Sequence, residues 1–195
     1  GDRFETLATS IAASYSNIFL THLQGGELSG SIDEKVRHAV TKLSDLHFVS
    51  TKRSKKIVEQ MGEDPKKVFF VGCPSIDIIK KINFKKKTNL SKYKYGVGHP
   101  VNLEKDYYVV LLHPVTTKYS KNNLIIQELL SCSKALNEQI IWLWPNNDAG
   151  SNIISKKIRS FREKYKLKIN FYTNFETEDY LKIIKNCKCL IGNSS

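Results

Sequence analysis

The chemically richest part of this sequence lies between His22 and His38, in the stretch HLQGGELSGSIDEKVRH. Two adjacent glycines, Gly25 and Gly26, separate an apolar run from the expected start of a helix. The polar side chains around them are His22, Gln24, Glu27, Asp33, Arg37 and His38. Core packing does not require acids, imidazoles and glycines in so short a span. Carboxylates and imidazoles carry protons in catalysis, and glycine lets the backbone approach a ligand closely, so the stretch indicates an active-site loop.

A purely structural interpretation stays open for several of these residues. His22 could be a hydrogen-bonded histidine at a strand end. Asp33 and Arg37 are four residues apart, so they share a helix face and could form only a surface ion pair. The sequence by itself leaves both interpretations standing.

Two further segments indicate anion binding. Asp2 and Arg3 directly precede an expected helix, whose amino end favours an anion, although Asp2 could simply cap that helix. In LLHPVTTK, His113 ends an expected strand, and the hydroxyls of Thr116 and Thr117 can join it around an anion.

Two more polar segments follow strands later in the chain. WPNNDAGS offers Asn146, Asn147 and Asp148 before a helix that Ser151 could cap, and a plain turn is the alternative. GNSS, with Ser194 and Ser195, is a small-residue loop that can present N–H groups and hydroxyls to phosphate.

Alternating helix and strand patterns position these segments. Asp33 is a plausible N-cap for the second helix. The expected helices are 4–16, 33–44, 52–61, 122–137, 151–166 and 176–186. The expected strands are 17–21, 46–50, 68–72, 107–112, 139–144, 168–172 and 188–191.

Short apolar strands that are each followed by an amphipathic helix indicate parallel sheets covered on both faces. Residues 83–105 have no sustained period, and we interpret them as a linker or surface excursion between two Rossmann-like lobes. Ligands bind at the carboxyl ends of such strands, which predicts a cleft between the lobes. The absence of GxGxxG and Walker motifs argues against dinucleotide and P-loop sites.

Composition narrows the class of protein. The chain has 195 residues and a formal net charge of +12, but its lysines are spread over expected helix surfaces. We attribute this charge mainly to surface decoration, then to attraction of a small anionic substrate, and expect no nucleic-acid partner. No apolar run reaches the roughly 18 residues of a membrane span, so we expect no membrane association.

The cysteines and the amino terminus indicate the compartment. The start of the chain lacks the features of a signal peptide. The four cysteines have no metal-binding spacing, so we expect reduced, partly buried thiols in a cytoplasmic protein, with neither a metal nor a cofactor. These residues are Cys73, Cys132, Cys187 and Cys189.

The ordered motifs together resemble one family. They are GDRFE, HLQGGELSGSIDEKVRHAVTKL, VGCPSID, LHPVTT, WPNNDAGS and IGNSS. The sequence is similar to the hydrolysing UDP-N-acetylglucosamine 2-epimerases of sialic-acid and legionaminic-acid biosynthesis. This resemblance implies an α/β, GT-B-like fold with two Rossmann-like lobes. By the resemblance, 1–82 is the later part of the first lobe and 106–195 the earlier part of the second, nucleotide-binding lobe.

The resemblance also implies a reaction. Members of this family eliminate UDP to form a 2-acetamidoglucal, which is then hydrated to N-acetylmannosamine. Such chemistry needs a carboxylate that removes the C2 proton and donors for the departing diphosphate. Asp2 and Asp33 match acid/base positions of the family, and we place Gln24 and Glu27 with them as catalytic candidates. The matching substrate-binding positions are Arg3, His22, His38, His113, Asn146, Ser194 and Ser195.

Gln24 departs from the pattern, because the animal enzyme has Glu there and an amide is no useful general base. Either Gln24 only orients the sugar, or this member prefers another 2-acetamido sugar. Non-hydrolysing epimerases, GT-B glycosyltransferases and a non-catalytic sugar-nucleotide-binding fragment stay as alternatives. We interpret the chain as a central fragment that binds UDP weakly or not at all by itself, and we expect the whole protein to be a homo-oligomer.

Overall fold

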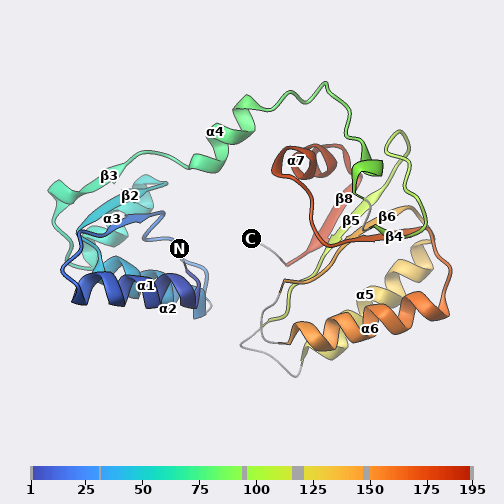
Figure 1. The fold of residues 1–195 in the computed structure, drawn as a ribbon, viewed down its shortest axis with the longest axis horizontal. Coiled ribbons are helices and arrows are strands. Elements are labelled where there is room, and N and C mark those ends of the chain that lie inside the picture. The colour runs from blue at the N-terminus through green and yellow to red at the C-terminus, as the bar shows by residue number, and fades with distance from the viewer. Residues whose placement is uncertain (1, 31, 94–95, 116–120, 147–149, 194–195) are drawn as a thin grey trace. The chain divides into compact units, whose positions relative to one another are not determined.

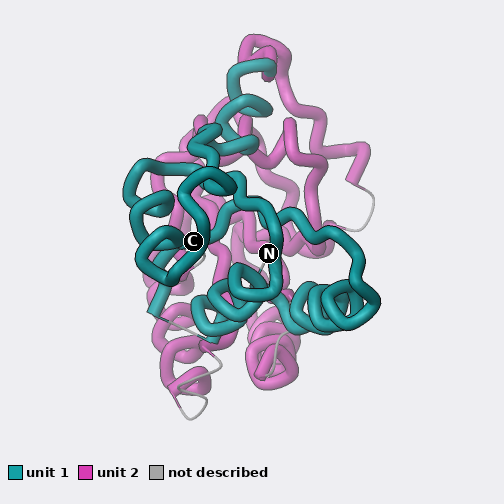
Figure 2. Tube along the Cα trace, turned by 90° about the vertical axis from the view of Figure 1, so that its left-hand side faces the viewer, with its two compact units in different colours: residues 1–81 teal, residues 82–195 magenta. Residues whose placement is uncertain are grey.

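The computed structural model describes residues 2–30, 32–93, 96–115, 121–146 and 150–193. The chain divides into two compact units, unit 1 from Gly1 to Lys81 and unit 2 from Ile82 to Ser195, which Figure 2 colours separately. Each unit has its own sheet, so each is described by itself.

Unit 1 contains a three-stranded parallel sheet in the order β1-β2-β3. Its strands are β1 (Thr21–Leu23), β2 (Leu46–Val49) and β3 (Val68–Phe70). Its helices are α1 (Phe4–Tyr15), α2 (Ile32–Leu43), α3 (Lys52–Gln60) and α4 (Pro74–Lys81), with a 3-10 turn at Pro65–Lys67. Val49, Val58 and Val68 are fully buried between α3 and the sheet. The Thr51 hydroxyl caps α3 by accepting the N–H of Ser54 at 2.9 Å.

Two local predictions in unit 1 are wrong. The strand expected at 17–21 begins only at Thr21, because Asn17 takes a left-handed conformation (φ 55°) and Ile18 and Phe19 lie exposed. Asp33 is not a cap, since α2 begins one residue before it. Glu34 instead accepts the N–H groups of the loop before α2, at 2.6 and 2.7 Å, and these hydrogen bonds lower its pKa.

Unit 2 contains a five-stranded sheet in the order β4-β7-β6-β5-β8 (Figure 1). Four strands are parallel, and only the short edge strand β4 is antiparallel to its neighbour. The strands are β4 (Val97–Gly98), β5 (Tyr108–Leu111), β6 (Ile140–Leu143), β7 (Ile169–Tyr172) and β8 (Cys189–Gly192). The helices are α5 (Asn122–Leu136), α6 (Ser151–Lys164) and α7 (Thr177–Asn186), with a 3-10 turn at Leu90–Lys92.

Helices cover both faces of the unit 2 sheet, with α5 and α6 on one side and α7 on the other (Figure 1). Alternate residues of the strands therefore enter two separate cores: Trp142 belongs to the core with α5 and α6, and Ile141 to the core with α7. In the second core the hydroxyl of Tyr107 donates to the carbonyl of Ile183 at 2.8 Å, and burial raises the pKa of Tyr107 to about 12. Side chains buried on both faces explain why β5, β6 and β7 are almost continuously apolar.

The segment 83–105 is part of unit 2. Leu90, Tyr93, Val101 and Leu103 pack against the core on the α7 side. The segment also contributes β4, a two-residue strand that the sequence analysis did not predict.

The four cysteines differ in exposure. All four cysteines are free thiols, but Cys132 and Cys189 are exposed, so the expectation of partial burial is wrong for these two.

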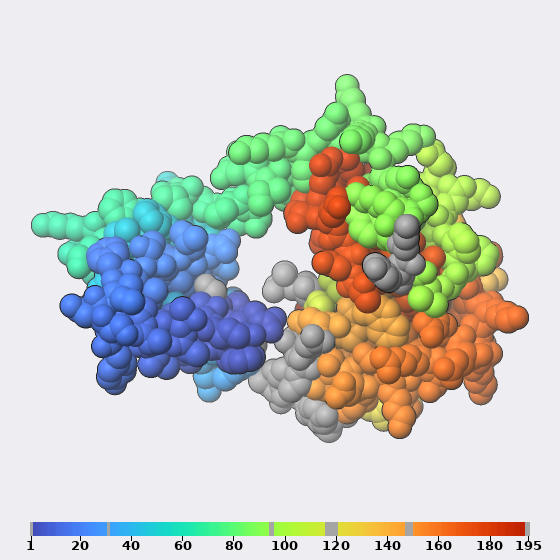
Figure 3. Space-filling view, in the orientation of Figure 1, coloured from blue at the N-terminus to red at the C-terminus, as the bar shows by residue number. Residues whose placement is uncertain are grey.

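Helix α1 lies at the surface of unit 1 (Figure 3), where Phe4, Ile11 and Tyr15 are exposed. No helix in the described ranges is both long enough and apolar enough to cross a membrane.

Candidate active site

Gln24 and the two glycines form the loop that follows β1 in unit 1. The backbone N–H of Gln24 donates to the carbonyl of Phe48 on β2 at 2.8 Å, and Gln24 itself takes a left-handed conformation (φ 63°). Gly25 and Gly26 are buried and let this loop pass close to α2 and α3. The loop is therefore held in one conformation at the carboxyl end of β1.

His22 is a buried histidine of β1 with 3% of its surface exposed. Its Nδ1 lies 3.1 Å from the hydroxyl of Thr41, and that hydroxyl donates to the carbonyl of Arg37 at 3.1 Å. Because the hydroxyl gives its hydrogen to this carbonyl, Nδ1 of His22 must be the donor of the first bond. This geometry favours the structural interpretation of His22, which joins the sheet to α2.

Arg37 connects the amino terminus to the glycine loop. Its guanidinium donates to Asp2 Oδ2 at 2.6 Å, to the carbonyl of Glu27 at 2.6 Å and to the hydroxyl of Ser29 at 3.4 Å. Only 7% of Arg37 is exposed, so the alternative interpretation of Arg37 as a member of a surface ion pair does not hold. The sequence analysis noted Arg37 in the polar stretch between His22 and His38 but did not assign it a catalytic or binding role.

The predicted acids of unit 1 differ in exposure. Asp2 is fixed by Arg37 and does not cap α1, whose N-cap position is occupied by Arg3. Glu27 is half-buried, and Asp33 is exposed in the first turn of α2. The structure therefore brings Asp2 to the backbone of the glycine loop through one guanidinium group.

Two predicted sugar-side or anion-binding residues of unit 1 have different surroundings. The side chain of Arg3 is exposed and pairs with Glu5 at 3.3 Å. His38 on α2 has an enclosed Nδ1 that finds no hydrogen-bond partner among the residues described. An enclosed imidazole nitrogen without a protein partner can bond to a bound ligand.

Gly26 offers a direct test of this loop geometry. We expect Gly26→Ala to lower the free energy of unfolding by about 2 kcal/mol or more. The left-handed conformation costs about 1–2 kcal/mol for alanine, and steric overlap adds to this cost. An added Cβ would lie 2.4 Å from the carbonyl oxygen of Ser54. Gly30→Ala is the matched control, since Gly30 also has a positive φ but nothing within 4 Å of its Cβ position. Denaturant unfolding of the two variants gives the comparison, and equal losses would contradict the close approach.

In unit 2, His113 joins the ends of three parallel strands. Its backbone N–H donates to Asn193 Oδ1 at 2.9 Å, and Asn193 Nδ2 donates back to its carbonyl at 2.8 Å. The backbone N–H of Asn146 donates to Nδ1 of His113 at 3.3 Å. His113, Asn193 and Asn146 follow β5, β8 and β6. The structure therefore brings His113 and Asn146, which were both candidate residues, together at one edge of the sheet.

The bond to Nδ1 determines what His113 can do. In the neutral imidazole an accepting Nδ1 leaves the hydrogen on Nε2, so His113 presents an N–H donor. The side-chain oxygen Oδ1 of Asn146 is enclosed and has no hydrogen-bond partner within the described part of the chain. This edge of unit 2 therefore offers a donor and an acceptor suited to a polar ligand.

Asn122 and Asn193 are the unit 2 residues that the sequence analysis missed. Asn122, the first residue of α5, is buried, accepts the N–H of Val115 at 2.9 Å and so holds the loop after His113. An asparagine at a helix start is the usual signal of such a contact. Ser151 does not cap α6, because the helix begins at Ser151 with Gly150 before it.

Several predicted residues lie outside the described residues. They are Thr116, Thr117, Asn147, Asp148, Ser194 and Ser195.

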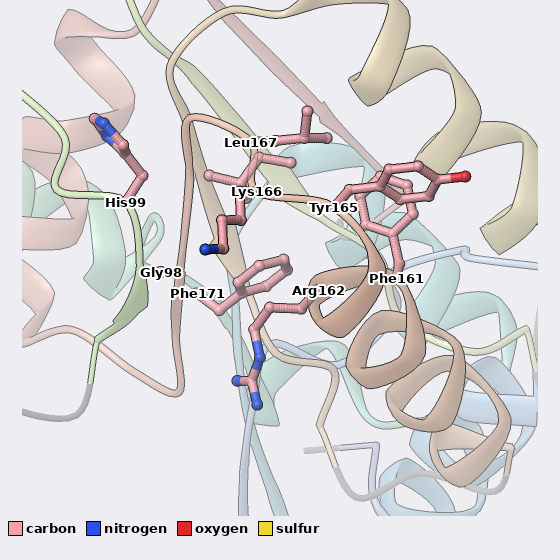
Figure 4. Close-up of a pocket in the computed structure, with 9 residues that line it drawn as sticks. Gly98, His99, Phe161, Arg162, Tyr165, Lys166, Leu167 and Phe171 are labelled. Carbon is pink, nitrogen blue, oxygen red and sulfur yellow. The ribbon is translucent and has the colours of Figure 1, made fainter.

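The unit 2 sheet also has a cavity of about 260 Å³ beside Ile169, the first residue of β7 (Figure 4). Phe161, Tyr165 and Phe171 give it an apolar wall. None of the predicted site residues that the structure describes lines this cavity, so it is separate from the edge that carries His113. Within the described ranges no three His, Cys, Asp or Glu side chains gather to hold a metal ion.

Comparison with known proteins decides the family. The sequence matches the UDP-N-acetylglucosamine 2-epimerase family over residues 1–195. The chain belongs to this family. The membership that the ordered sequence motifs predicted is therefore confirmed.

Curated relatives share its sequence along the whole chain. It is 39% identical to the polysialic acid biosynthesis protein P7 of Escherichia coli, covering 100% of this chain and 49% of that protein. It is 35% identical to the hydrolysing UDP-N,N'-diacetylbacillosamine 2-epimerase of Legionella pneumophila, covering 100% of this chain and 50% of that protein. The chain thus spans about half the length of the curated relatives it matches.

A solved epimerase shows the same fold. The crystal structure of the Methanocaldococcus jannaschii UDP-GlcNAc 2-epimerase, in complex with UDP-GlcNAc and UDP, superposes with a TM-score of 0.75 at 20% identity. The match covers 100% of this chain and 53% of that one. The predicted fold class, α/β and GT-B-like with Rossmann-like units built on parallel strands, is confirmed.

Proposed function

We propose that the whole protein containing this chain is a hydrolysing UDP-N-acetylglucosamine 2-epimerase. It converts UDP-N-acetylglucosamine, or a related UDP-2-acetamido sugar, to the free 2-epimer and UDP. The observation that carries this proposal is the Asp2 carboxylate, which buried Arg37 holds at the backbone of the glycine loop. The family supports the substrate class, and the name of the Legionella relative supports the hydrolysing type.

Unit 1 supplies the proton carriers in this proposal. A carboxylate removes the C2 proton, the bond between C1 and the UDP oxygen breaks, and a 2-acetamidoglucal forms. A proton then returns to C2 from the opposite face and the oxygen of water adds to C1. Asp2 and Asp33 are the proposed acid and base, with Glu27 as a further carboxylate. Gln24 orients the sugar, because an amide does not act as a general base at neutral pH.

Unit 2 supplies the nucleotide site in this proposal. The Nε2–H of His113 donates to a diphosphate oxygen and stabilises the charge that develops as UDP departs. Oδ1 of Asn146 accepts a hydrogen bond from the uracil ring. Ser194 and Ser195 are proposed as further donors to the diphosphate from the sequence alone. A strongly cationic chain, with a net charge of +12, favours the approach of an anionic sugar nucleotide.

Product analysis by NMR tests the proposed function. With the whole protein and UDP-N-acetylglucosamine or its diacetamido analogue, we expect UDP and a free 2-epimer in equal amounts. An intact UDP-N-acetylmannosamine would instead indicate a non-hydrolysing epimerase. A reaction that proceeds only with an added acceptor would indicate a glycosyltransferase.

A further inference from the structure

Cys73 contacts Gln24, an uncharged polar residue of the glycine loop. The side-chain nitrogen Nε2 of Gln24 lies 3.4 Å from Cys73 Sγ. Gln24 follows β1 and Cys73 lies in the loop after β3, and both strands neighbour β2 in the sheet. The contact therefore joins two loops at the carboxyl edge of unit 1.

Other donors also surround the Cys73 sulfur. The backbone N–H of Ser75 lowers the pKa of the Cys73 thiol most, burial opposes this, and the N–H of Ile76, the Ser75 hydroxyl and the Gln24 amide lower it further. Ser75 and Ile76 belong to the first turn of α4, whose amino end favours negative charge. The sulfur is therefore built to accept hydrogen bonds.

An accepting sulfur fixes the direction of the Gln24 amide. A primary amide has a donor end and an acceptor end, and only the NH₂ end can satisfy an acceptor. With Nε2 toward the sulfur, the carbonyl oxygen Oε1 lies at the other end of the amide. A glutamate at this position would place two acceptors against each other, so Gln24 and Cys73 suit one another as a pair.

We propose that Cys73 is a positioning residue that holds Nε2 of Gln24 and thereby makes Oε1 the acceptor for a donor group of the sugar. The 2-acetamido N–H is the donor that the proposed substrates share. This inference rests on the proposed function, since it assigns Gln24 a role toward the 2-acetamido sugar. It explains how an uncharged residue at this position selects a substrate group without taking part in proton transfer.

Steady-state kinetics of the whole protein tests the positioning role. We expect Cys73→Ala to raise KM for the UDP-sugar about five- to tenfold, the effect of one lost hydrogen bond, with kcat changed less than about twofold. Cys73→Ser restores KM to within about twofold, because a serine hydroxyl also accepts from Nε2. In a Gln24→Ala background, Cys73→Ala should not change KM further. Cys132→Ala, at an exposed cysteine of α5, is the matched control and should leave KM unchanged.

The outcomes separate this inference from the proposed function. An equal rise of KM in the wild-type and Gln24→Ala backgrounds would overturn the positioning role while leaving the epimerase proposal intact. Absence of turnover by the unsubstituted protein would overturn both. If Cys73→Ala does not fold, the iodoacetamide reaction of Cys73, followed by mass spectrometry, tests the contact. Gln24→Ala should slow that reaction, and an unchanged rate would overturn the proposal.

Discussion

Asp33→Asn is expected to lower kcat by about two to four orders of magnitude, the usual contribution of a general acid or base. Asn keeps the size of the side chain and removes its ability to exchange a proton. The fold should survive, because Asp33 is exposed on the first turn of α2 and losing a charge there costs no more than about 1 kcal/mol. Turnover and thermal unfolding of the whole protein, measured side by side, check both statements.

Asp106→Asn is the matched control for this prediction. Asp106 is an exposed aspartate of unit 2 that pairs with Lys188 at 2.8 Å on the surface. A surface ion pair of this kind contributes little, so kcat should stay within about twofold of the wild-type value. If both variants kept full turnover, Asp33 would not be the proton carrier.

His113→Ala is expected to lower kcat/KM by about two to three orders of magnitude, the usual effect of losing one preorganised donor to a developing negative charge. The variant also loses the acceptor of the Asn146 backbone N–H, so the proposed nucleotide site at this edge of unit 2 should become less ordered. We expect weaker inhibition by UDP together with slower turnover. Initial rates at several UDP concentrations measure both quantities.

Two further variants show whether the donor itself matters. His113→Asn should retain part of the activity, because the amide can accept from Asn146 on one side and donate on the other. His99→Ala is the control, since His99 is an exposed histidine of the same unit that lies beside the apolar cavity. Equal losses for His99→Ala and His113→Ala would argue against a specific role for His113.

Much of this fold can be predicted from the sequence. The four parallel strands of unit 2 are predicted to within a residue or two. In β5, β6 and β7 the reason is that side chains buried on both faces leave an almost uninterrupted apolar run. The first strand of unit 1 is displaced, because the apolar residues 18–20 read as a strand but Asn17 turns the chain before them. Strand β4 is not predicted, because two residues are too few to show the alternating hydrophobic pattern of a strand.

Less of the candidate site than of the fold can be predicted from the sequence. The sequence places His113 and Asn146 after two strands, and their contact follows because parallel strands end at one edge of the sheet. The partner of Asp2 is not predictable from spacing, since Arg37 is distant in sequence and meets it only through the packing of α2. The bond between Gln24 and Cys73 likewise depends on the order of three strands rather than on any local pattern.

Solvent deuterium at C2 of the product tests the central claim most directly. The whole protein, incubated with UDP-N-acetylglucosamine in deuterium oxide, should release UDP and free N-acetylmannosamine that carries one deuterium at C2, as seen by proton NMR and mass spectrometry. Deuterium enters because the C2 proton is lost to a carboxylate and replaced from solvent. A free product that retains the original hydrogen at C2 would contradict the proposed elimination and hydration.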